Sequence, residues 1–134
     1  MTLHEIYQQF APCQSWEARF RLLIQYSRQL PKPSAQELAE WQEIHGCESR
    51  LWFEFQRSPR QIHAYSDARL MQGLLFIIQT ALLEKSDDEL DRFDPQQIFD
   101  DLHITRHLTS TRLNGLAQIA KIVQDPTACS TDLA

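Results

Sequence analysis

The sequence contains few of the residues that build metal sites, disulfide frameworks or phosphate-binding loops. Its three cysteines, at positions 13, 47 and 129, form no CxxC pair. An odd number of widely spaced thiols indicates neither a disulfide framework nor a tetrahedral zinc site. The three glycines, at positions 46, 73 and 115, are too far apart for a phosphate cradle of the GxGxxG or GxxxxGK type. We therefore expect free thiols, no metal site and no bound cofactor.

Long apolar runs and clusters of basic residues are also missing. The longest apolar run, Leu74–Ile78, is far shorter than the roughly 20 residues that a membrane-spanning helix requires. The first residues lack the basic and apolar regions of a signal peptide, so we expect a cytoplasmic protein. The formal net charge is -5, and no basic cluster is present to neutralise phosphates. Neither a membrane nor nucleic acid is an expected partner.

Capping signals predict helices on both sides of the central segment. The chain of 134 residues has the size and composition of one domain, expected over residues 1–126, with a loose polar tail at 127–134. The helix that follows Ser15 is expected to extend to Leu30, before Pro31. Gly115 lies inside the last predicted helix, where we expect a close contact, since glycine there costs about 1 kcal/mol relative to alanine. The residues expected to cap helices are Thr2, Ser15, Ser34, Ser66 with Asp67, Ser86, Asp94 and Thr109.

Alternation with a period of two predicts a small antiparallel sheet in the centre of the chain. The segment Leu51–Gln56 places alternate apolar side chains on one face. Residues 57–60 are typical of a turn, and Gln61–Tyr65 of the returning strand. Trp41–His45 is a possible third strand. Because so small a sheet needs a cover for its apolar face, the predicted fold class is α+β, with about three antiparallel strands covered by helices.

Cys47 is the thiol whose surroundings favour reactivity. Cysteines that only pack lie in apolar segments, whereas the neighbours of Cys47 are polar. Nearby cations favour the thiolate of a cysteine, whose reference pKa is about 8.5, and a glycine adds backbone freedom. From these residues alone, a reactive thiol and a chance loop cysteine are equally open. The neighbours are His45, Gly46, Glu48, Ser49 and Arg50.

Other chemistries lack the spacing that they need. A phosphatase loop of the CxxxxxR type would place arginine where Phe53 stands. A stand-alone cysteine hydrolase or transferase would need a histidine as a base beside Cys47, and the sequence alone pairs none with it. Such an enzyme is one alternative, and an interaction protein with an incidental thiol is another. His103 and His107 are the only metal-like pair, and an ordinary exposed helix end is favoured over a metal site.

Ordered segments along nearly the whole chain, to about Val123, resemble the SufE/CsdE-type sulfur acceptors. The resemblance implies a SufE-like domain with the fold of the IscU-type cluster scaffolds. Cys13 and Cys129 do not fall at scaffold ligand positions. Cys13 is expected to pack, because it lies between two helical segments, and Cys129 to be incidental, because it lies in the tail outside the resemblance. The matching segments are Phe10–Glu17, Gln29–Pro31, Gly46–Trp52, Ser66–Ala68, Gly73–Leu75, Phe99–Leu102 and Leu108–Leu116.

The resemblance also implies a function for Cys47. In this interpretation Cys47 takes the outer persulfide sulfur of a pyridoxal-phosphate-dependent cysteine desulfurase, SufS-like or CsdA-like, and stimulates that enzyme without being an enzyme itself. The sulfur then passes to a downstream acceptor, for iron-sulfur cluster assembly or another sulfur pathway. The loop and Ile98–Leu102 look closer to the CsdE branch than to SufE. Asp67 and Arg112 match charged family positions near the loop, where a functional and a structural role are equally open. The residues expected in the loop and its partner contact are His45, Gly46, Glu48, Ser49, Arg50, Asp67 and Arg112.

Overall fold

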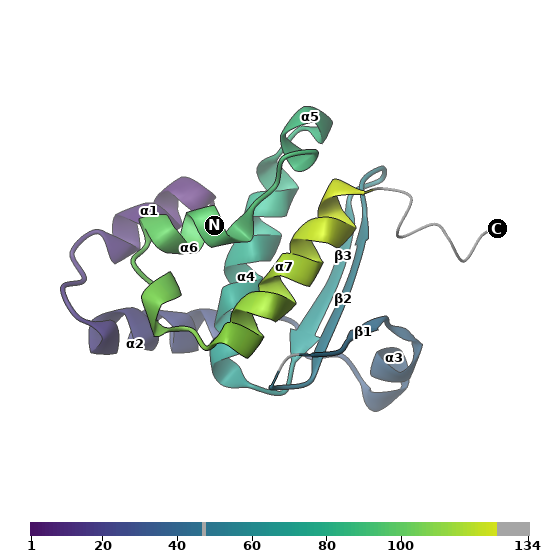
Figure 1. Cartoon of the computed structure of the whole chain (residues 1–134), viewed down its shortest axis with the longest axis horizontal. Coiled ribbons are helices and arrows are strands. Elements are labelled where there is room, and N and C mark those ends of the chain that lie inside the picture. Colours follow the sequence, from purple (N-terminus) through teal and green to yellow (C-terminus); the bar gives the residue numbers. More distant parts are fainter. Residues whose placement is uncertain (47, 126–134) are drawn as a thin grey trace.

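A three-stranded antiparallel sheet lies at the centre of the chain, in the order β1-β2-β3 (Figure 1). The computed structural model describes residues 1–46 and 48–125. The strands are β1 (Glu43–Ile44), β2 (Leu51–Gln56) and β3 (Gln61–Ser66). Seven α-helices and one short 3-10 helix surround them in the described part of the chain, so the predicted α+β class is confirmed.

The side chains of β2 alternate between the two faces of the sheet, as the period of two predicts. Leu51, Phe53 and Phe55 are buried in the main core, while Glu54 pairs with His63 on the opposite face. Strand β1 is shorter than the predicted 41–45. Trp41 ends the preceding helix, and the carbonyl of His45 accepts a hydrogen bond from a later helix instead of from β2.

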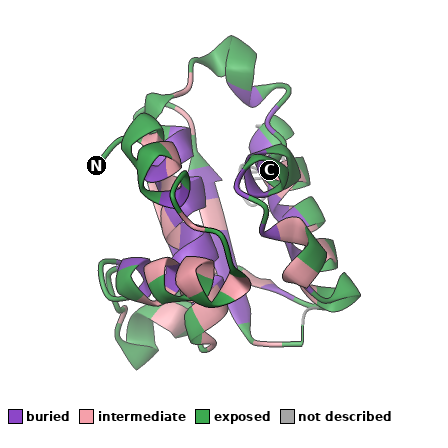
Figure 2. Ribbon diagram, turned by 90° about the vertical axis from the view of Figure 1, so that its left-hand side faces the viewer, coloured by how far each residue is buried: buried purple, intermediate pink, exposed green. Residues whose placement is uncertain are grey.

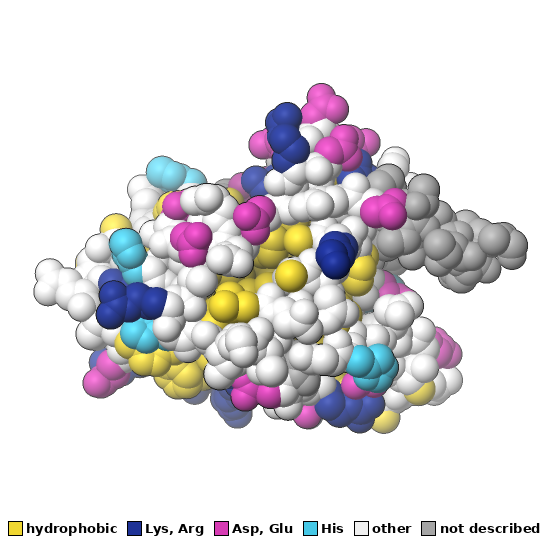
Figure 3. Space-filling model, in the orientation of Figure 1, with side chains coloured by type: hydrophobic (Ala, Val, Ile, Leu, Met, Phe, Trp, Pro, Cys, Tyr) yellow, Lys and Arg dark blue, Asp and Glu magenta, His cyan; other side chains and the backbone are white. Residues whose placement is uncertain are grey.

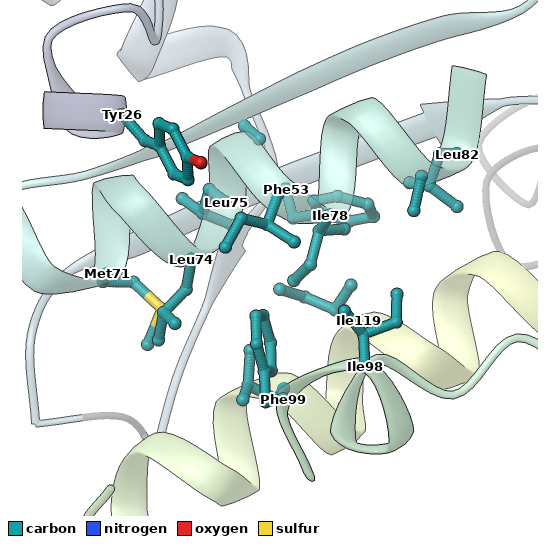
Figure 4. Close-up of a cluster of buried hydrophobic side chains, with 14 of the residues drawn as sticks. Tyr26, Phe53, Met71, Leu74, Leu75, Ile78, Leu82, Ile98, Phe99 and Ile119 are labelled. Carbon is teal, nitrogen blue, oxygen red and sulfur yellow. The ribbon is translucent and has the colours of Figure 1, made fainter. Parts of the chain in front are cut away.

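Helix α4 (Arg69–Glu84) is the most buried element and packs on β3 and on α2 (Trp16–Ser27). Figure 4 shows its apolar side chains meeting those of the sheet and of the later helices. A Cβ atom added to Gly73 would lie 2.3 Å from the backbone oxygen of Leu23. The close approach of α2 and α4 therefore depends on a glycine at position 73.

Most of the predicted helix starts are confirmed. Capping boxes begin α1 (Leu3–Phe10), α3 (Ala35–Glu40) and α5 (Asp87–Leu90). Ser15 caps α2, and Asp94 caps α6 (Pro95–Asp101), which has proline in its first turn. The hydroxyl or carboxylate oxygen accepts a backbone N–H that would otherwise have no partner in the helix.

Two helix boundaries differ from the prediction. Helix α2 ends at Ser27 and not at Leu30, because backbone bonds from residue i to i-3 tighten the chain there, including Gln29 N–H to the Tyr26 carbonyl at 2.9 Å. The prediction that Ser66 and Asp67 cap α4 is wrong. Its N-cap is Ala68, without any side-chain cap hydrogen bond.

Helix α7 (Ser110–Gln124) is capped by Thr109 as predicted, and it packs on β2 and α6. Gly115 is buried in it. The 3-10 helix η1 (Thr105–His107), which precedes α7, was not predicted. Figure 2 shows the buried residues on the facing sides of the helices and the sheet. None of the helices in the described part of the chain has the length and apolar character that crossing a membrane requires.

Two arginines in the β2–β3 turn bind the carboxyl ends of distant helices. Arg60 donates hydrogen bonds to the Leu82 carbonyl and, at 2.9 Å, to the Lys85 carbonyl at the end of α4. Arg57 donates to the Val123 carbonyl at 3.0 Å, near the end of α7. The last carbonyls of a helix have no partner within it, so these guanidinium groups satisfy them and complement the helix dipole.

Candidate functional site

The residues that flank Cys47 connect β1 to β2 and lie along α7. Cys47 itself lies outside the described residues. The His45 carbonyl accepts a hydrogen bond from Gln118 Nε2 at 2.8 Å, and the Gly46 carbonyl accepts one from Asn114 Nδ2 at 3.3 Å. Asn114 and Gln118 are four residues apart and therefore share one face of the helix. That face holds the segment before Cys47 through its backbone.

Gly46 has a conformation that suits glycine. Its φ is +94°, which L side chains rarely adopt. A Cβ atom at this position would also lie 3.0 Å from Asn114 Nδ2, the group that binds the Gly46 carbonyl. The glycine therefore permits both the direction of the chain before Cys47 and its close approach to α7.

Glu48, immediately after Cys47, is bound to the first turn of α7. Its Oε1 accepts hydrogen bonds from the hydroxyl of Thr109 and, at 3.2 Å, from that of Thr111, and Arg112 Nε lies 3.8 Å away. The hydrogen bond from Thr109 is the main cause that lowers the pKa of Glu48, and the charge of Arg112 adds to it. Glu48 is therefore ionised at neutral pH, and its charge suits the amino-terminal end of the helix.

Arg50 fixes the other end of the loop through its backbone. Its N–H donates to Asp67 Oδ1 at 3.0 Å, and its carbonyl accepts from the hydroxyl of Ser66 at 2.6 Å. Ser66 and Asp67 lie at the junction between β3 and α4. Their side chains bind Arg50 and provide no cap hydrogen bond for α4, although the Ser66 hydroxyl also accepts the Ala68 N–H at 3.2 Å.

The side chain of Arg50 points to a different partner. Its Nε and Nη2 each donate to the carboxylate of Glu43 at 3.0 Å, and its guanidinium carbon lies 4.6 Å from the centre of the Trp52 ring. The hydrogen bonds from Arg50 lower the pKa of Glu43, and the same contact raises the pKa of Arg50. The charge of Arg50 is thus paired with Glu43, on the face of the sheet that carries Trp52.

The structure brings together residues from three parts of the sequence. Asp67 and Arg112 both contact residues of the loop, and Ser49 is half-buried within it. The side chain of His45 is exposed. Sequence reasoning did not single out four residues that hold the loop or its arginine. These are Glu43, Thr111, Asn114 and Gln118.

The other candidate thiols and ligands are placed elsewhere. Cys13 is half-buried between α1 and α2, where its Sγ lies 3.8 Å from the Gln9 carbonyl. Cys129 lies outside the described residues. His103 and His107 do not share a helix, because α6 ends at Asp101 and η1 begins at Thr105. Within residues 1–46 and 48–125, no group of three or more His, Cys, Asp or Glu is placed to hold a metal ion.

The described residues form an α+β domain, in which a small antiparallel sheet is covered by helices and the segments before and after position 47 are anchored to the rest of the domain. The chain belongs to the SufE family, because the family model described as "Fe-S metabolism associated domain" matches residues 4–127. It is 42% identical over 117 residues to an uncharacterized SufE-like protein of Haemophilus influenzae, and the matched region covers 85% of this chain and 93% of the relative. It is 31% identical over 126 residues to the sulfur acceptor protein CsdE of Escherichia coli, covering 92% and 86% respectively. The resemblance to the SufE/CsdE-type proteins is therefore confirmed.

Proposed function

We propose that this protein is a sulfur acceptor that works with a cysteine desulfurase and carries the sulfur on Cys47. Membership of the SufE family, over residues 4–127, is the observation that carries the proposal. The relative from Escherichia coli is itself named a sulfur acceptor protein. The anchored segments on both sides of Cys47 support this choice of site, because the residues that flank it are held at both ends of the β1–β2 connection.

The transfer step conserves atoms and electrons. The Cys47 thiolate attacks the outer sulfur of a persulfide on the desulfurase, so a new bond forms between Cys47 Sγ and that sulfur. The sulfur–sulfur bond of the enzyme persulfide breaks, and its electron pair leaves with the enzyme cysteine as a thiolate. Nothing is oxidised or reduced overall, because the outer sulfur only changes its carrier. Cleavage of the carbon–sulfur bond of free cysteine belongs to the desulfurase and its pyridoxal phosphate.

The flanking residues set where Cys47 is presented to the enzyme. Glu48, one residue after Cys47, is held by the hydroxyls of Thr109 and Thr111, with Arg112 Nε 3.8 Å away. Arg50, three residues after Cys47, is held by Asp67 of the β3–α4 junction. In the free protein these contacts hold the loop against its own domain. Docking of the desulfurase exchanges some of them for contacts with the enzyme and exposes the thiol. A sheltered persulfide is protected from water and stray thiols before it reaches the downstream acceptor.

Mass spectrometry of the loaded protein tests the proposal. After incubation with a desulfurase and cysteine, the peptide that contains Cys47 should gain the mass of one sulfur atom. Cys47→Ser should abolish both this gain and the stimulation of the desulfurase, whereas the matched control Cys13→Ser should keep both. Continued sulfur loading and stimulation by Cys47→Ser would show that the carrier is wrongly assigned.

Two further measurements separate this proposal from its alternatives. Turnover of a small thioester without any partner would indicate a stand-alone thiol enzyme. Full stimulation of the desulfurase by Cys47→Ala would indicate an interaction protein with an incidental thiol.

We further propose a CsdA-like partner, which a pull-down against SufS-like and CsdA-like desulfurases tests directly. Stronger retention by the SufS-like enzyme would contradict this proposal.

A further inference from the structure

A concave site lies where α2 begins, at the left-hand end of the molecule in Figure 1, away from the β1–β2 connection. Its cavity has a volume of 430 Å³. Figure 3 shows basic and histidine side chains gathered at this end. The residues of the lining that bear on its chemistry are Ser15, Trp16, Arg19, His103, Arg106 and His107.

The lining is cationic although the protein is acidic overall. Two arginines and two histidines line the cavity, and among the described residues no Asp or Glu does, whereas the chain carries a formal net charge of -5. Glu17, in the same turn of α2, pairs with Arg21 at 2.5 Å and lies outside the lining. Positive charge gathered in a concavity favours an anionic ligand.

Arg19 is held in place but is not saturated with hydrogen bonds. Its Nη2 donates to the Cys13 carbonyl at 3.0 Å, while its Nε is buried and has no hydrogen-bond partner among the described residues. The loss of its contact with water is not compensated, as is also true of the Nε atoms of Arg57 and Arg112 among the described residues. An oxyanion in the cavity would offer acceptors to this guanidinium group.

One wall of the cavity is fixed by a contact between two aromatic rings. The Trp16 and His107 rings stack with centroids 4.4 Å apart and an interplanar angle of 16°. His103 has φ +59°, in the left-handed region, directly before the turn that carries Arg106. Burial and the charges of Arg106 and Arg19 lower the pKa of His107, and a bound anion would offset those charges.

We propose that this cavity is a binding site for a small oxyanion of the phosphate class. The two guanidinium groups match the geometry of phosphate oxygens, and the amino-terminal end of the 12-residue helix α2 adds favourable backbone dipoles. The site is separate from the loop around Cys47 and does not depend on its sulfur chemistry.

NMR titration of the full-length protein tests this site, with the indole N–H of Trp16 as the probe. Sodium phosphate should shift this signal to saturation, while sodium chloride at equal ionic strength should not. Arg106→Gln and Arg19→Gln should each weaken binding by about tenfold or more, because a charged hydrogen bond is lost. The matched control Arg92→Gln removes an exposed arginine outside the lining and should bind as the native protein does.

A second arm distinguishes free phosphate from a phosphate group on a small molecule. Adenosine monophosphate that binds more tightly than phosphate, with no binding of adenosine, would assign the site to phosphorylated small molecules. Equal affinity for the two phosphates would assign it to inorganic phosphate. The proposal would be overturned if the Trp16 signal followed ionic strength alone, or if folded Arg106→Gln bound phosphate as tightly as the native protein. It would also be overturned if adenosine bound as tightly as its monophosphate.

Discussion

The substitution Gly46→Ala tests whether the described path of the loop matters for sulfur transfer. Gly46 has φ +94°, its carbonyl binds Asn114, and it directly precedes Cys47. The added methyl group would favour a different backbone conformation and would meet Asn114 Nδ2 at 3.0 Å. Because Gly46 and Asn114 are both exposed, the side chain of Asn114 can move away, and the backbone conformation is the larger effect.

The expected magnitude follows from the backbone conformation. An L residue in the left-handed region costs about 1–2 kcal/mol relative to glycine. This corresponds to a decrease of roughly 5- to 30-fold in the equilibrium constant between the described loop conformation and its alternatives. The main core does not include Gly46, so the midpoint of thermal unfolding should change by less than about 2 °C.

Two assays measure the outcome. The side-chain amide signals of Asn114 and Gln118 report the hydrogen bonds to the Gly46 and His45 carbonyls, and both should shift toward those of free amides. The rate of sulfur transfer to Cys47 should fall with the population of this conformation, by at most roughly 5- to 30-fold. Gly46→Asn should reduce the transfer rate less than Gly46→Ala does, because asparagine adopts positive φ more readily than alanine. The reasoning fails if Gly46→Ala keeps both the amide shifts and the transfer rate, or if adding Asn114→Ala restores that rate.

Three other predictions concern stability and pH. Gly73→Ala should lower the free energy of unfolding by about 1–3 kcal/mol, although alanine is the better helix former, because its Cβ would lie 2.3 Å from the Leu23 oxygen; a gain in urea resistance would contradict the packing. Arg60→Ala should cost about 2 kcal/mol through the lost bonds to the end of α4, against less than about 0.5 kcal/mol for Arg92→Ala in the same denaturation assay. Because the pKa of Glu48 is lowered, its carboxylate contributes fully to stability above the usual glutamate pKa. This contribution to stability is lost as the pH falls through the lowered pKa. The amide signals of Thr111 and Arg112 should therefore shift in acid in the native protein but stay constant in Glu48→Gln, and equal shifts in both would refute the assignment.

The parts of the fold that depend on neighbouring residues could be predicted from the sequence. The caps at Thr2, Ser34 and Ser86 require only residues three positions apart, so their signals are complete in a short segment. The pairing of β2 with β3 depends on alternation and a short turn. Ser66 and Asp67 carried a similar capping signal, but their side chains bind Arg50, 16 and 17 residues away. The Ser66 hydroxyl keeps one local bond, from the Ala68 N–H at 3.2 Å, but Ala68 is the N-cap and the helix has no side-chain cap.

The candidate site was predicted in a different way. The resemblance to a family indicated Asp67 and Arg112, and the structure places both beside the loop. Asn114 and Gln118 were missed because they act on backbone carbonyls 68 and 73 residues earlier. Polar residues at these positions are typical of the exposed face of a helix, and their spacing does not indicate that they bind distant backbone carbonyls.

Thr109 connects the folding of a helix to the position of the loop. Its hydroxyl accepts the Arg112 N–H at 3.3 Å as the cap of α7 and donates its proton to Glu48, and one hydroxyl can do both at once. The two bonds are thermodynamically linked, since movement of Glu48 changes the environment of the cap, and fraying of the first turn removes the donor for Glu48. Such a linkage is reciprocal. A partner that reshapes the first turn of α7 therefore shifts the loop beside Cys47 without touching it.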